Sequence, residues 1–219
     1  QYVRLTNVLG SNTNKVVDVQ LATTHTVAIT ENAELYMWGK ISFGQISDGI
    51  TSQYLYTPEK VMNHVVSASV NSYRTAAITE DGELYMWGKN TYGQIGDGTT
   101  TNRTSPQKIM DNVVYVSLGG ECSAAITDNG DLYTWGYNAN GALGDGTTTN
   151  RYTPQKVMEN VVIVNMTYNG STMAVTEDGS VYTWGYNANG ELGDGTKNNR
   201  YSPYKTMENA IDAKPCAII

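Results

Sequence analysis

Cysteine and histidine are nearly absent from this sequence, and with them most of the side chains that build metal sites and disulfide frameworks. Of 219 residues, only Cys122 and Cys216 are cysteines, and only His25 and His64 are histidines. No Cys-His pair lies at metal-ligand spacing, and there is no Gly-x-Ser-x-Gly motif and no phosphate-binding loop ending in Lys-Ser or Lys-Thr. We therefore predict no catalytic site, no metal and no cofactor.

Charged residues are also scarce. Lys and Arg number 14 against 21 Asp and Glu, a net charge of −7, and charged residues make up 16% of the chain. A negative chain repels a polyanion unless a basic face is segregated, so we predict no nucleic-acid partner. No apolar run is long enough to span a bilayer, which predicts no membrane insertion. Because the first residue is Gln, we expect a piece of a longer or processed product.

What the sequence does contain is a repeat. Its four tryptophans, each followed by glycine, are spaced 49, 48 and 49 residues apart: Trp38, Trp87, Trp135 and Trp184. The nonapeptide YTWGYNANG occurs twice, at 133–141 and at 182–190. We treat residues 1–219 as a single repeat domain. Its copies are 16–64, 65–112, 113–160 and 161–209, with 1–15 as the end of a preceding repeat and 210–219 as the stub of a following one.

Each copy predicts a small antiparallel sheet. In the third copy, VVYVSL and SAAIT are short segments rich in β-branched and small apolar residues, as strands are. Asp-Asn-Gly-Asp between SAAIT and LYTW is typical of a tight hairpin, because Asn-Gly tolerates the positive φ that the turn requires. PQKVM follows a Gly- and Thr-rich loop as a fourth strand, and no copy has a sustained helical pattern. The predicted fold class is all-β, with four antiparallel strands in each copy.

Segments such as LYMW carry large side chains on both faces, so each sheet must be covered on both sides. Stacking similar sheets face to face does this by repetition. Radial stacking gives a β-propeller, whereas linear stacking gives a solenoid. Four strands in a repeat of about 49 residues favour propeller blades.

The segment from Ala76 to Ile109, AAITEDGELYMWGKNTYGQIGDGTTTNRTSPQKI, resembles the regulator of chromosome condensation repeat. The likeness extends over most of the chain, and it implies a propeller of about seven blades. About four blades are present, so we expect an incomplete, open propeller or one completed by neighbouring chains. The first copy departs from the pattern, with Ser47 in place of glycine and Leu55 in place of arginine. The fourth copy has one extra residue near Tyr168.

We predict structural roles for residues that recur in every copy. The tryptophans occupy one slot, YxWG, and are expected in the core rather than as a stacking platform or a light sensor. The repeated Asp is expected to accept turn amides, and the Arg to brace the long loop. One carboxylate per loop does not make a calcium site. These residues are Trp38, Trp87, Trp135, Trp184, Asp97, Asp145, Asp194, Arg103, Arg151 and Arg200.

The loop after each Trp-Gly differs between copies and carries an aromatic residue. Aromatic side chains on the loops of a rigid scaffold make good contact residues, because they bury area at small entropic cost. The alternative is that these rings only cover the sheet edges. The predicted binding residues are Phe43, Tyr92, Tyr137, Tyr186 and, in the inserted turn, Tyr168.

The preferred function is a non-enzymatic repeat scaffold that binds a protein or a surface partner through its loops. The resemblance also implies two alternatives, guanine-nucleotide exchange on a small GTPase and inhibition of another enzyme by a protein cap. Uncovered end sheets attract a neighbour, so we expect homo-oligomers through the exposed blade faces. The Asn-, Thr- and Tyr-rich composition favours a segment of a secreted or cell-surface bacterial protein.

Overall fold

The structure is a computed structural model that describes residues 14–40 and 54–208. All regular elements in these ranges are β-strands, so the predicted all-β class is confirmed. The first two sheets contain β1 (Val16–Leu21), β2 (His25–Thr30), β3 (Leu35–Lys40), β4 (Tyr54–Met62), β5 (Val65–Val70), β6 (Arg74–Thr79), β7 (Leu84–Gly88) and β8 (Arg103–Met110). The next two contain β9 (Val113–Leu118), β10 (Cys122–Thr127), β11 (Leu132–Gly136), β12 (Arg151–Met158), β13 (Val161–Met166), β14 (Ser171–Thr176), β15 (Val181–Gly185) and β16 (Arg200–Met207).

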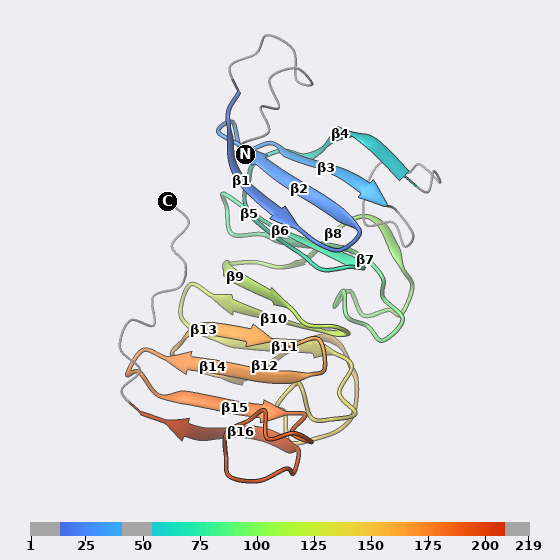
Figure 1. The fold of residues 1–219 in the computed structure, drawn as a ribbon. Coiled ribbons are helices and arrows are strands. Elements are labelled where there is room, and N and C mark those ends of the chain that lie inside the picture. Colours follow the sequence, from blue (N-terminus) through green and yellow to red (C-terminus); the bar gives the residue numbers. More distant parts are fainter. Residues whose placement is uncertain (1–13, 41–53, 209–219) are drawn as a thin grey trace.

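Each sheet consists of four strands that follow one another in the chain and pair antiparallel (Figure 1). The predicted blades of four antiparallel strands are therefore confirmed. The fourth strand is longer than PQKVM and its relatives suggested. In the second sheet it begins at Arg103, which lies opposite Gly88 of β7. The longer strand brings the arginine of each long loop into the sheet.

The hairpin between β6 and β7 shows why the Asp-Gly sequence produces this topology. The Thr79 amide donates to the Glu83 carbonyl (3.0 Å), and the Gly82 amide donates to the Thr79 carbonyl (2.9 Å). Gly82 has a φ of 74°, a conformation that glycine adopts without steric cost. The turn therefore sets the register, in which Ile78 lies opposite Leu84.

The four sheets follow one another in an open arc (Figure 1). The first strands of successive sheets are neighbours: β1 contacts β5, β5 contacts β9, and β9 contacts β13. Two residues separate one sheet from the next, and the second of them takes a positive φ, as at Asn112 (59°). Within the described residues the first and fourth sheets do not join, so the arc is not closed.

The hydrophobic core lies between the sheets, which explains why both faces of a strand are apolar. Ala76 and Ala77 are adjacent on β6, point to opposite faces, and are both fully buried. Ala77 packs in the cluster shared by the first and second sheets, together with Trp87. Ala76 packs in the cluster shared by the second and third sheets, together with Trp135. A third cluster, which contains Trp184, lies between the third and fourth sheets.

Each tryptophan whose sheet has a described sheet before it packs against that preceding sheet. Trp87, Trp135 and Trp184 are fully buried between sheets. Trp38 on β3 is only partly buried, because no sheet precedes the first one within the described residues. Burial of the indole therefore depends on the neighbouring repeat and not on the repeat that contains it.

Candidate functional site

The described long loops and short turns of the sheets lie along one edge of the arc, which we call the loop face. Strand direction alternates within an antiparallel sheet, so the turn after the first strand and the loop after the third strand lie at the same end. Phe43 and Ser47 belong to the corresponding loop of the first sheet and lie outside the described residues. The described parts of the loop face are the turns 22–24, 71–73, 119–121 and 167–170 and the loops 89–102, 137–150 and 186–199.

A fully buried asparagine supports each described long loop. Asn138 accepts the Leu143 amide through Oδ1 (3.0 Å) and donates through Nδ2 to the Asp145 carboxylate (3.1 Å). The same Nδ2 donates to the backbone carbonyls of Thr147 and Thr149, both at 3.1 Å. These bonds fix the loop backbone from within. Sequence reasoning missed this residue, although its spacing of 48 and 49 residues carried the signal: Asn90, Asn138 and Asn187.

An Asp-Arg pair joins the two ends of each loop. Asp145 accepts the Thr147 amide (3.0 Å) and hydroxyl (2.7 Å) on Oδ1 and the Arg151 Nε (2.6 Å) on Oδ2. Burial alone would raise the pKa of the Asp145 carboxyl, but the hydrogen bonds from Thr147 and Arg151 outweigh it and hold that pKa below its usual value. Both partners belong to one repeat, so the pair braces its own loop. The other described pairs are Asp97 with Arg103 and Asp194 with Arg200.

Arg74, at the start of β6, is a fully buried cation that sequence reasoning did not select. Its Nη1 donates to the Gln94 carbonyl (3.1 Å) and to Ser123 Oγ (2.6 Å), and its Nη2 donates to the carbonyls of Gly119 (2.7 Å) and Cys122 (3.1 Å). Burial lowers the pKa of Arg74 to about 10, so the guanidinium stays charged at neutral pH. Arg74 thus ties the long loop of the second sheet to the short turn of the third.

Aromatic and charged side chains of the second and third repeats contact one another on the loop face. The rings of Tyr92 and Tyr137, from the second and third long loops, lie 4.9 Å apart at 55°. Lys89 Nζ lies 6.0 Å from the Tyr92 ring centroid and 5.2 Å from that of Tyr73, and it pairs with the Glu121 carboxylate. Tyr92 keeps 37% of its surface exposed. The loop face therefore presents rings that are held in place by contacts across repeats.

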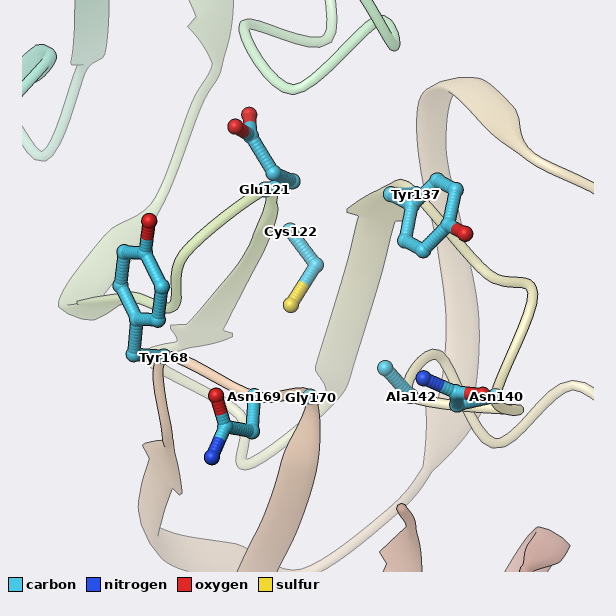
Figure 2. Close-up of a pocket in the computed structure, with 8 residues that line it drawn as sticks. All are labelled: Glu121, Cys122, Tyr137, Asn140, Ala142, Tyr168, Asn169 and Gly170. Atoms are coloured by element: carbon cyan, nitrogen blue, oxygen red, sulfur yellow. The ribbon is translucent and has the colours of Figure 1, made fainter.

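A small cavity of about 110 Å³ lies beside Tyr137 (Figure 2). Tyr137 and Tyr168 lie on opposite sides of it, with Cys122 between them (Figure 2). Tyr168, 71% exposed, is in the four-residue turn 167–170, where the other described sheets have three residues. Cavities for drug-sized ligands measure roughly 300–1,000 Å³, so this one suits a single side chain. Its polar lining comes from Glu121, Asn140 and Asn169.

The cavity lining includes one thiol, that of Cys122, and its environment makes it a poor nucleophile. The thiol is buried. Burial raises the pKa of Cys122 to about 11, so the sulfur stays protonated at neutral pH and carries no thiolate character. The cavity is therefore suited to contact rather than to covalent chemistry.

The structure brings three of the predicted binding tyrosines together and separates the fourth. Tyr92 packs on Tyr137, and Tyr137 shares a cavity with Tyr168. Tyr186 is partly buried one sheet farther along and does not line the cavity; its carbonyl accepts the Ser171 hydroxyl (2.8 Å). Of the polar cavity residues, Asn169 belongs to the inserted turn that the sequence marked as a contact spot, whereas Glu121 and Asn140 were not selected. The sequence did not show that these residues meet, because they come from three separate segments.

Two further observations concern metals and membranes. Among the residues that the structure describes, no three His, Cys, Asp or Glu side chains gather as they would around a metal ion. The ranges 14–40 and 54–208 contain no helix of the length and apolarity needed to cross a bilayer.

Comparison with known proteins identifies the repeat. The family model described as RCC1-like domain matches residues 3–217. Similar solved structures include human WBSCR16, with 23% identity, a TM-score of 0.75 and coverage of 90% of this chain and 54% of that one. Prp20p from Saccharomyces cerevisiae has 20% identity and a TM-score of 0.78, with coverage of 91% of this chain and 52% of that one. Yeast RCC1 (Prp20) bound to Kap60 has 20% identity and a TM-score of 0.79, with coverage of 91% of this chain and 50% of that one. No curated protein matches the chain.

At these identities the solved structures show the fold alone, and the chain spans about half the length of each of them. The resemblance that the segment from Ala76 to Ile109 predicted is confirmed by the family model, which extends over nearly all of the sequence. With its four meandering sheets, its buried inter-sheet tryptophans and this match, the chain belongs to the RCC1-like domain family.

Proposed function

We propose that the chain is a non-enzymatic scaffold that binds a protein partner through its loop face. The observation that carries the proposal is the position of Tyr137 and Tyr168 on one small cavity, with the Tyr92 ring packed on that of Tyr137. Interface hot spots are enriched in aromatic residues that are rigidly held and flanked by polar groups. The cavity offers such an arrangement at the junction of two repeats.

The chemistry of the cavity indicates the kind of contact. Its volume of about 110 Å³ accepts one apolar or aromatic side chain of a partner, packed between Tyr137 and Tyr168. Asn140 and Asn169 can hydrogen-bond the polar backbone on either side of that side chain. Because Arg74 and Asn138 hold the loops from within, little ordering cost is added on binding.

The test compares the partners captured by the wild type and by the double variant Tyr137→Ala with Tyr168→Ala. Loss of two aromatic contacts should weaken binding at least about tenfold. The matched control is Tyr186→Ala, which removes a loop-face ring outside the cavity. A second control, Tyr186→Phe, removes only its hydroxyl. Circular dichroism melts verify that all variants are folded. If the cavity variant keeps the same partners with the same affinity, the loop face is not the binding site.

An exchange factor for a small GTPase is the second candidate. Two proteins of similar structure bind protein partners: Prp20p binds Gsp1p and histones, and yeast RCC1 (Prp20) binds Kap60. Nucleotide-release assays on a panel of small GTPases test this activity. A rate increase that requires Tyr137 and Tyr168 would favour exchange, and binding without release would favour the plain scaffold. An enzyme-inhibiting cap, the third candidate, would show as inhibition of a captured enzyme.

We also propose that the end sheets of the arc are covered by another chain. Leu21 on β1 is 76% exposed, and Met173 on β14 is 37% exposed. Apolar residues with this much exposed surface on an uncovered sheet face favour association.

We also propose a secreted or cell-surface location in a bacterium, which the Asn-, Thr- and Tyr-rich composition supports. Fractionation of the source cell tests this location.

A further inference from the structure

Each sheet has two different faces, and the interior of the arc shows how they fit. The face toward the preceding sheet carries a tryptophan, and the face toward the following sheet carries the loop that receives it. Trp184 Nε1 donates to the Ala142 carbonyl of the preceding loop (2.9 Å). A Cβ added at Gly144 would lie 2.6 Å from that nitrogen, so only glycine lets the indole approach. Trp135 makes the same contact with the loop of the second sheet.

A tyrosine on the outer strand makes a second contact at the same interface. Tyr201 lies on Gly141 of the preceding loop, where an added Cβ would be 2.4 Å from the tyrosine ring. The Gly146 amide donates to the Tyr201 carbonyl (2.8 Å). The interface before it repeats both contacts with Tyr152, Gly93 and Gly98.

The first sheet presents the tryptophan face without a preceding sheet in the described residues. In the first sheet Leu55 pairs with Gly39, and in the fourth sheet Arg200 pairs with Gly185. The next residues, Tyr56 and Tyr201, therefore occupy equivalent positions, or slots, in their sheets. Tyr56 is 87% exposed. Val19 is 45% exposed, whereas the residues in its slot on the other first strands are at most 7% exposed: Ala68, Val116 and Val164.

The fourth sheet presents the receiving face. Gly190 and Gly193 occupy the slots of Gly141 and Gly144, and an added Cβ at Gly193 would meet nothing within 4 Å. Met173 on the same face is 37% exposed. The residues in the slot of Met173 on the second and third sheets are fully buried: Ala76 and Ala124. The faces at the two ends of the arc therefore carry the same complementary features as the faces that meet between neighbouring sheets.

We propose that a second copy of this chain docks head to tail, with the first sheet of one copy packed on the fourth sheet of the other. Trp38 then lies over Gly193 and donates to the Glu191 carbonyl, and Tyr56 lies on Gly190. The inference rests on the proposed self-association and assigns its partner and geometry. The chain spans about half of each similar propeller, and two copies supply eight sheets, within the range of roughly four to eight blades that propellers contain, so both pairs of faces can be covered in a closed dimer.

Light scattering on the purified 219-residue chain measures the assembly. The expected mass is twice the 23.9 kDa of one chain. Val19→Lys and Met173→Lys each place a charge in one half of the interface and should each halve the mass. Val17→Lys is the matched control, because Val17 lies on the same strand in a slot that is exposed in the second and third sheets as well: Val66 and Val114. This variant should keep the dimer.

Mixing the variants tests the head-to-tail arrangement. Val19→Lys retains an intact fourth-sheet face and Met173→Lys an intact first-sheet face, so an equimolar mixture should recover the double mass through one interface. Tyr56→Ala removes a highly exposed ring, whose ring contact is with its strand neighbour Tyr54, and should weaken the dimer at least about tenfold while the sheet stays folded.

A wild type that stays at the mass of one chain overturns the proposal. So does a dimer that only one of the two lysine variants dissociates, because a like-face dimer would behave in that way. The loop-face variant Tyr137→Ala with Tyr168→Ala should keep the dimer, so failure of the dimer and failure of partner binding are seen separately.

Discussion

Trp135 donates its indole N–H to the carbonyl oxygen of Gln94, 3.1 Å away in the loop of the preceding sheet. The same carbonyl accepts Arg74 Nη1 (3.1 Å) and Ser123 Oγ (2.8 Å). Three donors from two sheets thus fix one backbone group of the loop face. The loop face is an extension of the inter-sheet core, and a change in that core alters the loops as well.

Replacing Trp135 with Ala should lower the free energy of unfolding by about 3–5 kcal/mol, because it leaves a cavity between two sheets and removes one of the three hydrogen bonds to the Gln94 carbonyl. Trp38→Ala should cost clearly less, since this indole is only partly buried. Urea denaturation of both variants, at a protein concentration that keeps the chain monomeric, measures the difference. If the two variants lose the same free energy of unfolding, the preceding sheet does not contribute to the stability that the tryptophan provides.

Replacing Arg74 with Ala should cost about 3 kcal/mol or more, because it leaves a buried cavity and removes the charged donor that the Gly119 and Cys122 carbonyls share. Arg74→Lys retains the charge but not the fork of donors, so its stability should lie between those of Ala and wild type. Thermal melts rank the three proteins. A melting temperature for Arg74→Ala equal to that of wild type would exclude the bridging role.

His25 should make the fold sensitive to mild acid. It is buried with Nε2 3.0 Å from Thr75 Oγ1, and burial lowers the pKa of His25 from 6.5 to about 4. Between pH 6.5 and pH 4 the unfolded chain binds a proton on this histidine and the folded chain does not. The free energy of unfolding is therefore highest above pH 6.5 and falls as the pH drops toward 4, by at most about 3 kcal/mol. Urea midpoints of wild type and His25→Gln across this range test it. His64→Gln, which replaces an exposed imidazole, is the matched control variant.

Arg151→Ala should weaken folding by about 1–3 kcal/mol and leave partner binding unchanged, because the pair with Asp145 lies within one loop. The pKa of Asp145 is depressed, so its contribution is present above the ordinary value of 3.8 and is lost as the pH falls below it. The variant should therefore lose less stability than wild type in this acid range. Unchanged stability with lost binding would instead assign the arginine to the interface.

The strands and hairpins could be predicted because each depends on a few neighbouring residues. The two copies of YTWGYNANG show where such reasoning ends. Gly141 is buried under Tyr201, whereas Gly190, in the same nonapeptide, is exposed. Identical sequences differ here because a following sheet covers one and not the other within the described residues. Burial between repeats depends on position in the arc, which local sequence does not encode.

Arg74 and the cavity were missed for a related reason. The slot of Arg74 holds His25, Cys122 or Ser171 in the other sheets, so no periodic signal marks it. The cavity joins residues of the third sheet to the turn before β14, and only the stacking of sheets brings them together. The extra residue at 167–170 was visible in the sequence, but its position beside Tyr137 was not.

Hydrogen exchange of the four indole N–H groups, followed by NMR, tests the stacking of sheets most directly. Single Trp→Phe variants assign the signals, and the Val19→Lys background keeps the end faces uncovered. The indoles of Trp87, Trp135 and Trp184 should exchange far more slowly than that of Trp38. Four indoles that all exchange at the rate of an exposed side chain would contradict the account.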